Sequence, residues 1–133
     1  PMTKNLYLFD THALIFWHNK KNVSEDFVKF FDQEAEKGTI YVSSISFWEI
    51  ALLVKKGRIE IPDVHLWKNE ILQNSNLQEI NPTTSEMIDS TILPDIHKDP
   101  FDRLLISQSN QNKLTLVTKD KIIPKYDVKI LWL

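Results

Sequence analysis

Short, strongly apolar runs alternate along the chain with longer segments in which apolar residues recur every three or four positions. The runs 6–9 and 114–118 have the character of strands that are buried on both faces of a sheet. The longer segments have the spacing of helices that bury one face. This alternation predicts an α/β fold, with a mostly parallel sheet of about five strands flanked by helices.

Start and stop signals place the boundaries of these elements. Gly38 and Gly57 are suited to end two of the helices, and Pro100 fits the first position of another. Thr83 and Glu86 have the spacing of a capping box. The predicted strands cover residues 6–9, 39–42, 77–80, 114–118 and 128–133. The predicted helices cover residues 11–17, 22–37, 46–56, 64–73, 85–92 and 100–110.

The composition is that of one ordinary domain. The chain has 133 residues, of which 42% are hydrophobic and 26% charged, enough for a core and a soluble surface. We expect a single domain over residues 1–133, with residues 1–4 as a flexible or tag-derived start. Cysteine is absent, which excludes disulfides and thiolate metal sites. No apolar run reaches the length of about 18 residues needed to span a membrane, and the cytoplasm is the simplest location.

The charge balance limits how the protein could bind nucleic acid. Sixteen basic residues stand against 18 acidic ones, and the formal net charge is −2. A protein that binds nucleic acid mainly by releasing counterions is normally more basic, which argues against tight, non-specific duplex binding. A nuclease stays compatible with this charge, because divalent cations would reverse the local sign of an acidic site.

Four acidic residues are predicted to meet at one edge of the sheet. Asp10 directly follows the first strand, and Asp120 closely follows the fourth. Glu49 and Asp102 lie in the first turns of two predicted helices. In open parallel sheets the carboxyl ends of the strands share an edge, and ligands bind there near a switch in strand order.

Each of these residues also has an ordinary structural interpretation. Asp10 is placed to cap the next helix, and Asp120 to close an Asx turn. Ser46 and Glu49 have the spacing of a capping box, and both aspartates of the segment 99–102 could serve the start of their helix. Taken together, however, four crowded carboxylates repel one another, and a hard cation relieves that repulsion. Oxygen ligands favour Mg²⁺ or Mn²⁺ over zinc, as one ion or two.

The order and spacing of several motifs resemble a PIN-domain ribonuclease, specifically a VapC-type toxin of a type II toxin–antitoxin system. These motifs are FDTHALIFW at 9–17, SISFWEIALLVKKGRI at 44–59, HKDPFDRLLISQS at 97–109 and LVTKD at 116–120. The resemblance extends over essentially the whole chain, through the closing YDVKILWL. It implies a Rossmann-like sheet and an Mg²⁺- or Mn²⁺-dependent endoribonuclease. It also implies a homodimer that a cognate antitoxin holds inactive, with RNA as the substrate.

The resemblance also assigns roles to individual residues. Asp99 is close enough to be a ligand or a supporting partner, and Thr118 matches a small hydroxyl residue that often lies near the site. Thr11 is a candidate cap beside Asp10. The family's acidic residues fall on Asp10, Glu49, Asp102 and Asp120. A catalytically silent PIN-like module that binds RNA or protein is the alternative.

Few basic residues are available to contact phosphate near this site. Arg103 directly follows Asp102, so on a helix it points about 100° away, and an ion pair that supports the site is favoured slightly over RNA contact. The candidate RNA contacts are Arg103, Lys119, Lys121, Lys55, Lys56 and Arg58.

Other residues near the predicted edge suggest weaker alternatives. His12 and His97 are interpreted as surface or capping residues rather than as substrate contacts. An aspartyl phosphatase normally has a second aspartate two residues after the first, where this chain has His12. A phospho-accepting receiver domain would match Lys119, but it needs an aspartate after the strand at 39–42, and none follows.

Overall fold

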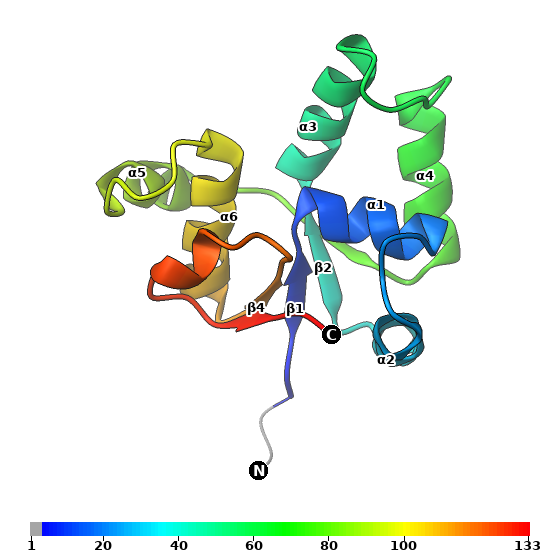
Figure 1. Cartoon of the computed structure of the whole chain (residues 1–133), viewed down its shortest axis with the longest axis horizontal. Helices are drawn as coiled ribbons and strands as arrows, with labels where there is room; N and C mark the ends of the chain where they lie inside the picture. Colours follow the sequence, from blue (N-terminus) through cyan, green and yellow to red (C-terminus); the bar gives the residue numbers. More distant parts are fainter. Residues whose placement is uncertain (1–3) are drawn as a thin grey trace.

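The structure is a computed structural model that describes residues 4–133 (Figure 1). The expected flexible or tag-derived start at residues 1–4 therefore lies mostly outside the described residues. Lys4, the one member that is described, is exposed. Over residues 4–133, none of the helices is both long and apolar enough to cross a membrane.

Five parallel strands form a single sheet in the order β3-β2-β1-β4-β5, as the alternating pattern predicted. The strands are β1 (Tyr7–Phe9), β2 (Ile40–Ser43), β3 (Gln78–Ile80), β4 (Thr115–Val117) and β5 (Ile130–Leu131). The central strand β1 sets Leu8 opposite Tyr41 of β2 and opposite Leu116 of β4. The strand order reverses between β1 and β4, which marks the expected binding edge of such a sheet.

The helices follow the predicted order with small shifts at their ends. They are α1 (Thr11–Asn19), α2 (Glu25–Glu36), α3 (Ser44–Lys55), α4 (Val64–Asn74), α5 (Thr84–Ile92) and α6 (Pro100–Asn112). The capping box of Thr83 and Glu86 is present at the start of α5. Gly38 and Gly57, which follow α2 and α3, have φ angles of 70° and 71°, a conformation that glycine adopts without strain. A short 3-10 helix at Ile123–Lys125 was not predicted.

Two apolar cores lie on opposite faces of the sheet. Phe9 of β1 packs on one face with Phe27 and Phe31 of α2, and all three side chains are fully buried. Leu8 points to the other face and packs with Leu105 of α6. In Figure 1, α5 and α6 lie on one side of the sheet, and α1, α2 and α4 lie on the other. This layering leaves the carboxyl ends of β1 and β4 free to carry a site.

Candidate metal centre

Asp10 and Asp120 follow the two strands that lie side by side at the centre of the sheet, β1 and β4. The Asp10 amide donates a 3.1 Å hydrogen bond to the Val117 carbonyl, which ties the ends of these strands together. The Asp10 carboxylate accepts a 2.8 Å hydrogen bond from the Ala13 amide and is the N-cap of α1, as one interpretation predicted. This cap fixes the side chain at the carboxyl edge of the sheet.

An open cavity of about 380 Å³ lies at this edge. It brings together all four of the predicted carboxylates, and Asp99 joins them. The lining residues are Asp10, His12, Phe16, Glu49, His97, Asp99, Asp102, Lys119 and Asp120. Five carboxylates thus share a cavity whose lining contains a single lysine, and this imbalance favours the binding of a cation.

Glu49 reaches the cavity from the second turn of α3. The helix begins at Ser44, and the Ser43 hydroxyl caps it by accepting a 3.4 Å hydrogen bond from a first-turn amide. The predicted helix start at Ser46, and the capping box that paired Ser46 with Glu49, are therefore wrong. Ser46 is buried inside α3, where its hydroxyl accepts a 3.1 Å hydrogen bond from Thr11.

Asp99 and Asp102 both lie at the start of α6, but they make different contacts. Asp99 is the N-cap, and its carboxylate accepts a 2.9 Å hydrogen bond from the Phe101 amide. Pro100 occupies the first helical turn, as predicted. Asp102 lies in the same turn, but its carboxylate contacts His97 at 2.9 Å. The capping interpretation is therefore confirmed for Asp99, and it does not describe Asp102.

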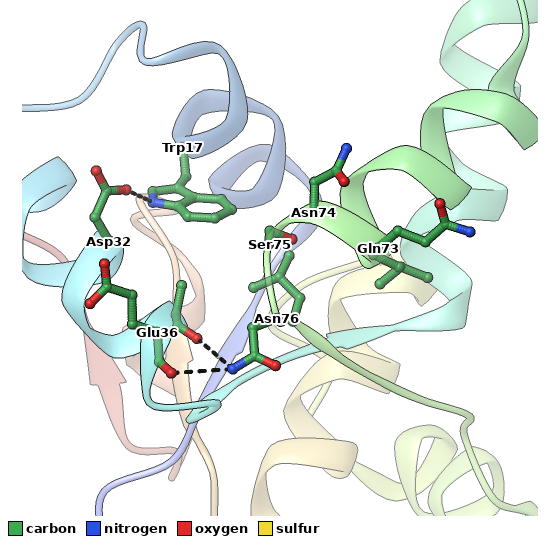
Figure 2. A pocket seen from close by; sticks show the side chains of 10 residues that line it. Trp17, Asp32, Glu36, Gln73, Asn74, Ser75 and Asn76 are labelled. Atoms are coloured by element: carbon green, nitrogen blue, oxygen red, sulfur yellow. Dashed lines mark hydrogen bonds between the residues drawn. The ribbon is translucent and has the colours of Figure 1, made fainter.

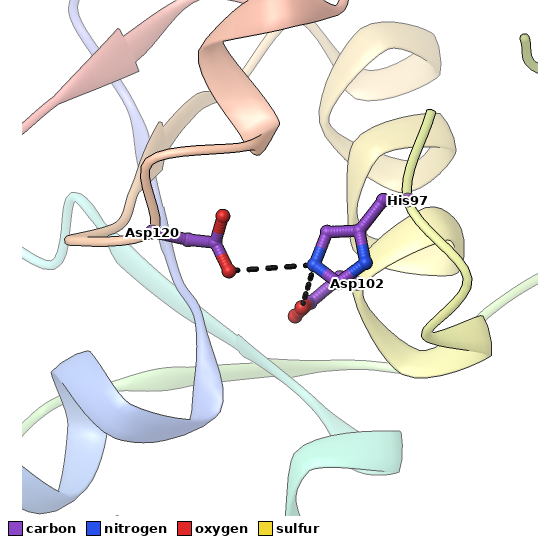
Figure 3. A group of neighbouring side chains, drawn as sticks. All are labelled: His97, Asp102 and Asp120. Atoms are coloured by element: carbon purple, nitrogen blue, oxygen red, sulfur yellow. Dashed lines mark hydrogen bonds and ion pairs between the residues drawn. The ribbon is translucent and has the colours of Figure 1, made fainter. Parts of the chain in front are cut away.

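His97 lies between the carboxylates of Asp102 and Asp120, as Figure 3 shows. Its Nε2 atom is 2.9 Å from Asp102 Oδ2 and 3.3 Å from Asp120 Oδ2. One donor atom from each of these residues lies within 4.8 Å of the other two. The side chain is only 14% exposed, so the interpretation of His97 as a surface residue is wrong. Its Nδ1 accepts a 3.2 Å hydrogen bond from the Asp99 amide, but the residue that caps α6 is Asp99 itself.

Burial and mutual repulsion make two of the carboxyls difficult to ionise. Burial raises the pKa of Asp10, and the nearby Thr118 hydroxyl and Ala13 amide offset the shift only in part. The pKa of Asp102 is raised to about 8, first by burial and then by the charges of its neighbours, among them Asp99. A divalent cation would supply the positive charge that these groups lack.

Asp120 has the opposite shift. Burial raises the pKa of its carboxyl, but hydrogen bonds from the Ile122 and Ile123 amides and from His97 outweigh burial, so the net pKa lies below the ordinary value. The distances from Asp120 Oδ1 to these amide nitrogens are 2.6 Å and 3.1 Å. The predicted Asx turn is therefore present. Asp120 is therefore easier to ionise than an ordinary carboxyl, whereas its neighbour Asp102 is harder to ionise.

The two predicted hydroxyl residues have different surroundings. Thr118 is buried beside Asp10, and its hydroxyl accepts a 3.1 Å hydrogen bond from the Asp120 amide. It therefore supports both carboxylates, in agreement with the family pattern. Thr11 does not cap α1, because Asp10 does so, and its hydroxyl donates to Ser46 of α3. That contact joins the two helices that carry Asp10 and Glu49.

Arg103 is a structural residue. Its guanidinium donates to the carbonyls of Ser90, Leu93, Pro94 and His97 at 2.9–3.2 Å, and to the Tyr126 hydroxyl at 3.3 Å. The side chain is 12% exposed. The guanidinium thus holds the segment before α6 through backbone carbonyls, and the expected ion pair with an acidic residue of the site is not formed. These contacts leave the guanidinium poorly suited to bind RNA phosphate.

The other candidate phosphate contacts lie at two places. Lys119 is exposed on the rim of the cavity, with its Nζ 5.8 Å from the centre of the Phe16 ring. Lys121 is exposed close by in sequence. The basic residues at the end of α3 do not line the cavity, and Lys55 is about 9 Å along the helix from Glu49. Exposed residues at that end are Lys55, Lys56 and Arg58.

A second hollow, of about 520 Å³, lies between α1, α2 and the end of α4 (Figure 2). Several of its polar side chains are hydrogen-bonded within the fold. Asp32 accepts hydrogen bonds from Trp17 at 2.9 Å and from Lys20 at 2.8 Å. Asn76 donates to the carbonyls of Ala35 and Glu36 at the end of α2. This hollow contains none of the predicted site residues.

Comparison with protein families decides the kind of domain. The family model of the PIN domain matches residues 7–129. The chain belongs to the PIN-domain family. The match spans four of the five strands and all six helices and ends just before β5, and it confirms the PIN-domain part of the resemblance stated from the motifs. No curated protein matches this PIN domain at a significant level.

Solved structures share the fold of this PIN domain at low sequence identity. VapBC2 from Rickettsia felis, bound to a DNA fragment from their promoter, matches with a TM-score of 0.74 and 19% identity, covering 96% of this chain and 99% of the other. DNA-bound VapBC from Salmonella typhimurium matches with a TM-score of 0.68 and 16% identity, covering 96% and 98%. FitAcB from Neisseria gonorrhoeae matches with a TM-score of 0.63 and 19% identity, covering 95% and 96%. These similarities establish a common architecture.

Proposed function

We propose that this PIN domain is a cytoplasmic, divalent-metal-dependent endoribonuclease and the toxin of a VapC-type toxin–antitoxin pair. The observation that carries the proposal is the convergence of Asp10, Glu49, Asp102 and Asp120 around one cavity at the strand switch point. The similarity in fold to chains of VapBC and FitAcB assemblies supports the assignment to the VapC-type branch of the family. RNA as the substrate follows from the resemblance of the motifs.

The residues of the cavity suit Mg²⁺ or Mn²⁺, as one ion or two. Carboxylate oxygens are the donors these ions prefer, and a crowded acidic set needs positive charge to ionise fully. A bound ion supplies an activated water and offsets charge that develops on the phosphoryl oxygens. Asp10, Glu49, Asp102 and Asp120 would hold the ions, and Asp99 borders them.

Residues of the chain itself orient the metal-binding carboxylates and provide a contact for the substrate. The cap on α1 orients Asp10, and two backbone amides orient Asp120, so neither carboxylate must be ordered when a metal binds. Lys119 is the basic side chain on the rim and is placed to contact a phosphate of the RNA. All four acidic positions are occupied by acids, which favours an enzyme over a catalytically silent module.

Purified, antitoxin-free protein should cleave single-stranded RNA with Mg²⁺ or Mn²⁺ and should not cleave it in EDTA. Asp10→Asn should lower the cleavage rate at least about 100-fold, because an amide is a weaker metal ligand. Asparagine is a good N-cap, so α1 should be retained. Gel analysis of end-labelled RNA, with DNA of the same sequence alongside, measures the rates.

Asp63→Asn is the matched control for this experiment. Asp63 is the exposed N-cap of α4 and lies outside the cavity, and the substitution makes the same chemical change. Its cleavage rate should equal that of the parent. Cleavage that persists in EDTA, or an Asp10→Asn protein as active as the Asp63→Asn protein, would contradict the metal-nuclease proposal.

We also propose that the protein forms a homodimer and binds an antitoxin. Large apolar side chains are exposed on two helices, with Trp48 on α3 62% exposed and Ile92 at the end of α5 73% exposed. Such exposed residues are common at protein interfaces. Light scattering should give twice the monomer mass of 15.6 kDa at micromolar concentration. A monomer at every practical concentration would argue against the homodimer.

A further inference from the structure

The hydrogen bonds of His97 decide which ring nitrogen carries a proton. The Asp99 amide donates to Nδ1 at 3.2 Å, so Nδ1 presents its lone pair and cannot carry a hydrogen in that direction. The neutral ring then carries its hydrogen on Nε2. Nε2 is the atom that lies 2.9 Å from Asp102 and 3.3 Å from Asp120. The imidazole is therefore a donor to both carboxylates.

We propose that His97 is a positioning residue, which donates its Nε2–H to Asp102 and Asp120 and does not itself coordinate the metal. Coordination through Nε2 would move the hydrogen to Nδ1, where it would meet the Asp99 N–H. Asp99 is the N-cap of α6 and its carboxylate is bound to the Phe101 amide, so the start of the helix fixes the direction of that N–H. The inference rests on the proposed metal centre.

The backbone of His97 is held in place by two residues from other parts of the fold. Its amide donates to the Tyr126 hydroxyl at 2.7 Å, and its carbonyl accepts from Arg103 at 3.2 Å. Tyr126 is buried, and its hydroxyl also donates to the Pro94 carbonyl at 2.9 Å. The segment before α6 is therefore anchored on both sides of the ring, and the imidazole is fixed before any metal binds.

His97 links two carboxylates that lie on different elements of the fold. Asp102 is on α6, whereas Asp120 is in the loop after β4. Without a donor between them, their charges repel, and Asp102, which lacks the amide contacts that orient Asp120, would have to be reoriented when a metal binds. Groups that orient metal ligands in this way typically change metal affinity by about 10- to 100-fold. We therefore expect His97 to act on metal affinity first and on the cleavage rate through it.

Two substitutions separate a donor from a metal ligand. His97→Gln keeps an N–H donor at a similar reach, and His97→Leu removes the donor while keeping an apolar side chain of comparable bulk. Calorimetric titration with Mn²⁺ alone should show at least about tenfold weaker binding for the leucine variant and less than about threefold for the glutamine variant. His65→Gln, at an exposed position on α4 outside the cavity, is the matched control and should bind like the parent.

Long-range ¹H–¹⁵N spectra of the parent protein report the tautomer directly, with the His97→Gln protein used for assignment. The His97 signals should show a protonated Nε2 in EDTA and in saturating Mg²⁺. A deprotonated Nε2 in the Mg²⁺ form would overturn the proposal in favour of direct coordination. This measurement does not use the His97→Leu protein, so it decides the question even if that variant does not fold.

The outcomes also separate this inference from the proposed function. If the parent binds no Mn²⁺, the metal centre itself is wrong and the inference falls with it. If the parent binds Mn²⁺ and His97→Leu binds it equally well, the metal centre stands and the role of His97 is wrong. Equal losses in the leucine and glutamine variants would likewise contradict positioning by a donor.

Discussion

Replacing Asp102 by asparagine is expected to abolish RNA cleavage while making the metal-free protein more stable. Asp102 lies at the middle of the acidic centre, where burial and four neighbouring carboxylates disfavour its charge. In the proposed enzyme it is a metal ligand, so we expect the cleavage rate to fall about 1,000-fold or more, which corresponds to about 4 kcal/mol of transition-state stabilisation.

The stability gain has the same physical origin as the loss of activity. An amide carries no charge, so Asp102→Asn removes repulsion at a site that is only 18% exposed. Its side-chain oxygen can still accept the Nε2–H of His97. We expect an increase of about 1–3 kcal/mol in the free energy of unfolding, measured by urea denaturation in EDTA near pH 8.

The control for this measurement is again Asp63→Asn, which should change stability by less than about 0.5 kcal/mol because asparagine also caps helices well. Addition of Mg²⁺ should stabilise the parent and not the Asp102→Asn protein. A large loss of stability in the Asp102→Asn protein would show that the carboxylate has a structural role, and retained cleavage would remove Asp102 from the centre.

The position of the acidic centre could be predicted because it depends on local patterns. The apolar run before Asp10 identifies a buried strand, and the DPFD segment combines an N-cap, an N1 proline and an acid in the first turn of α6. Parallel strands then bring their carboxyl ends to one edge without any knowledge of tertiary contacts. The same reasoning places Glu49 correctly even though the start of its helix was wrong.

The errors arise where a tertiary contact decides between local alternatives. Three serines, at positions 43, 44 and 46, can each begin α3. The burial of Ser46 against Thr11, which lies 35 residues away in sequence, excludes it as the cap. A local pattern carries no information about such a contact, so the residue spacing alone predicted a capping box that does not form.

His97 was missed for a related reason. Its place depends on Tyr126, 29 residues further along the chain, and on an arginine of the following helix. The one local signal was its spacing of two residues before the N-cap Asp99, which sets the ring against the Asp99 amide. Tyr126 itself follows a 3-10 helix, which the spacing of hydrophobic residues did not predict.

The metal-free protein is expected to lose stability as the pH rises from about 4 to about 8, and divalent cations should reverse the loss. The pKa of Asp102 is raised from 3.8 to about 8 by burial and by neighbouring charges, and that of Asp10 is raised in the same direction, chiefly by burial. A carboxyl with a raised folded-state pKa contributes stability below its unfolded pKa, and this contribution is lost as the pH rises through the folded value.

Asp120 acts in the opposite sense. Burial raises the pKa of Asp120, but the amide hydrogen bonds and His97 lower it by a larger amount, so the net pKa is lowered. The contribution of Asp120 to stability is therefore present above the unfolded pKa and is lost in acid. The two trends together place the stability maximum of the metal-free protein at mildly acidic pH. Because the acids share one centre, we expect a total loss on the order of 3 kcal/mol between pH 5 and pH 8.

Urea denaturation in EDTA across this pH range measures the slope, with the Asp102→Asn protein as the comparison. The substitution should flatten most of the decline, since its side chain does not titrate. Saturating Mg²⁺ should also flatten it in the parent, because metal ligation requires the ionised carboxylates and becomes more favourable as the pH rises. A parent profile that is flat in EDTA would mean that the carboxyls ionise independently and that the centre has no need of a cation.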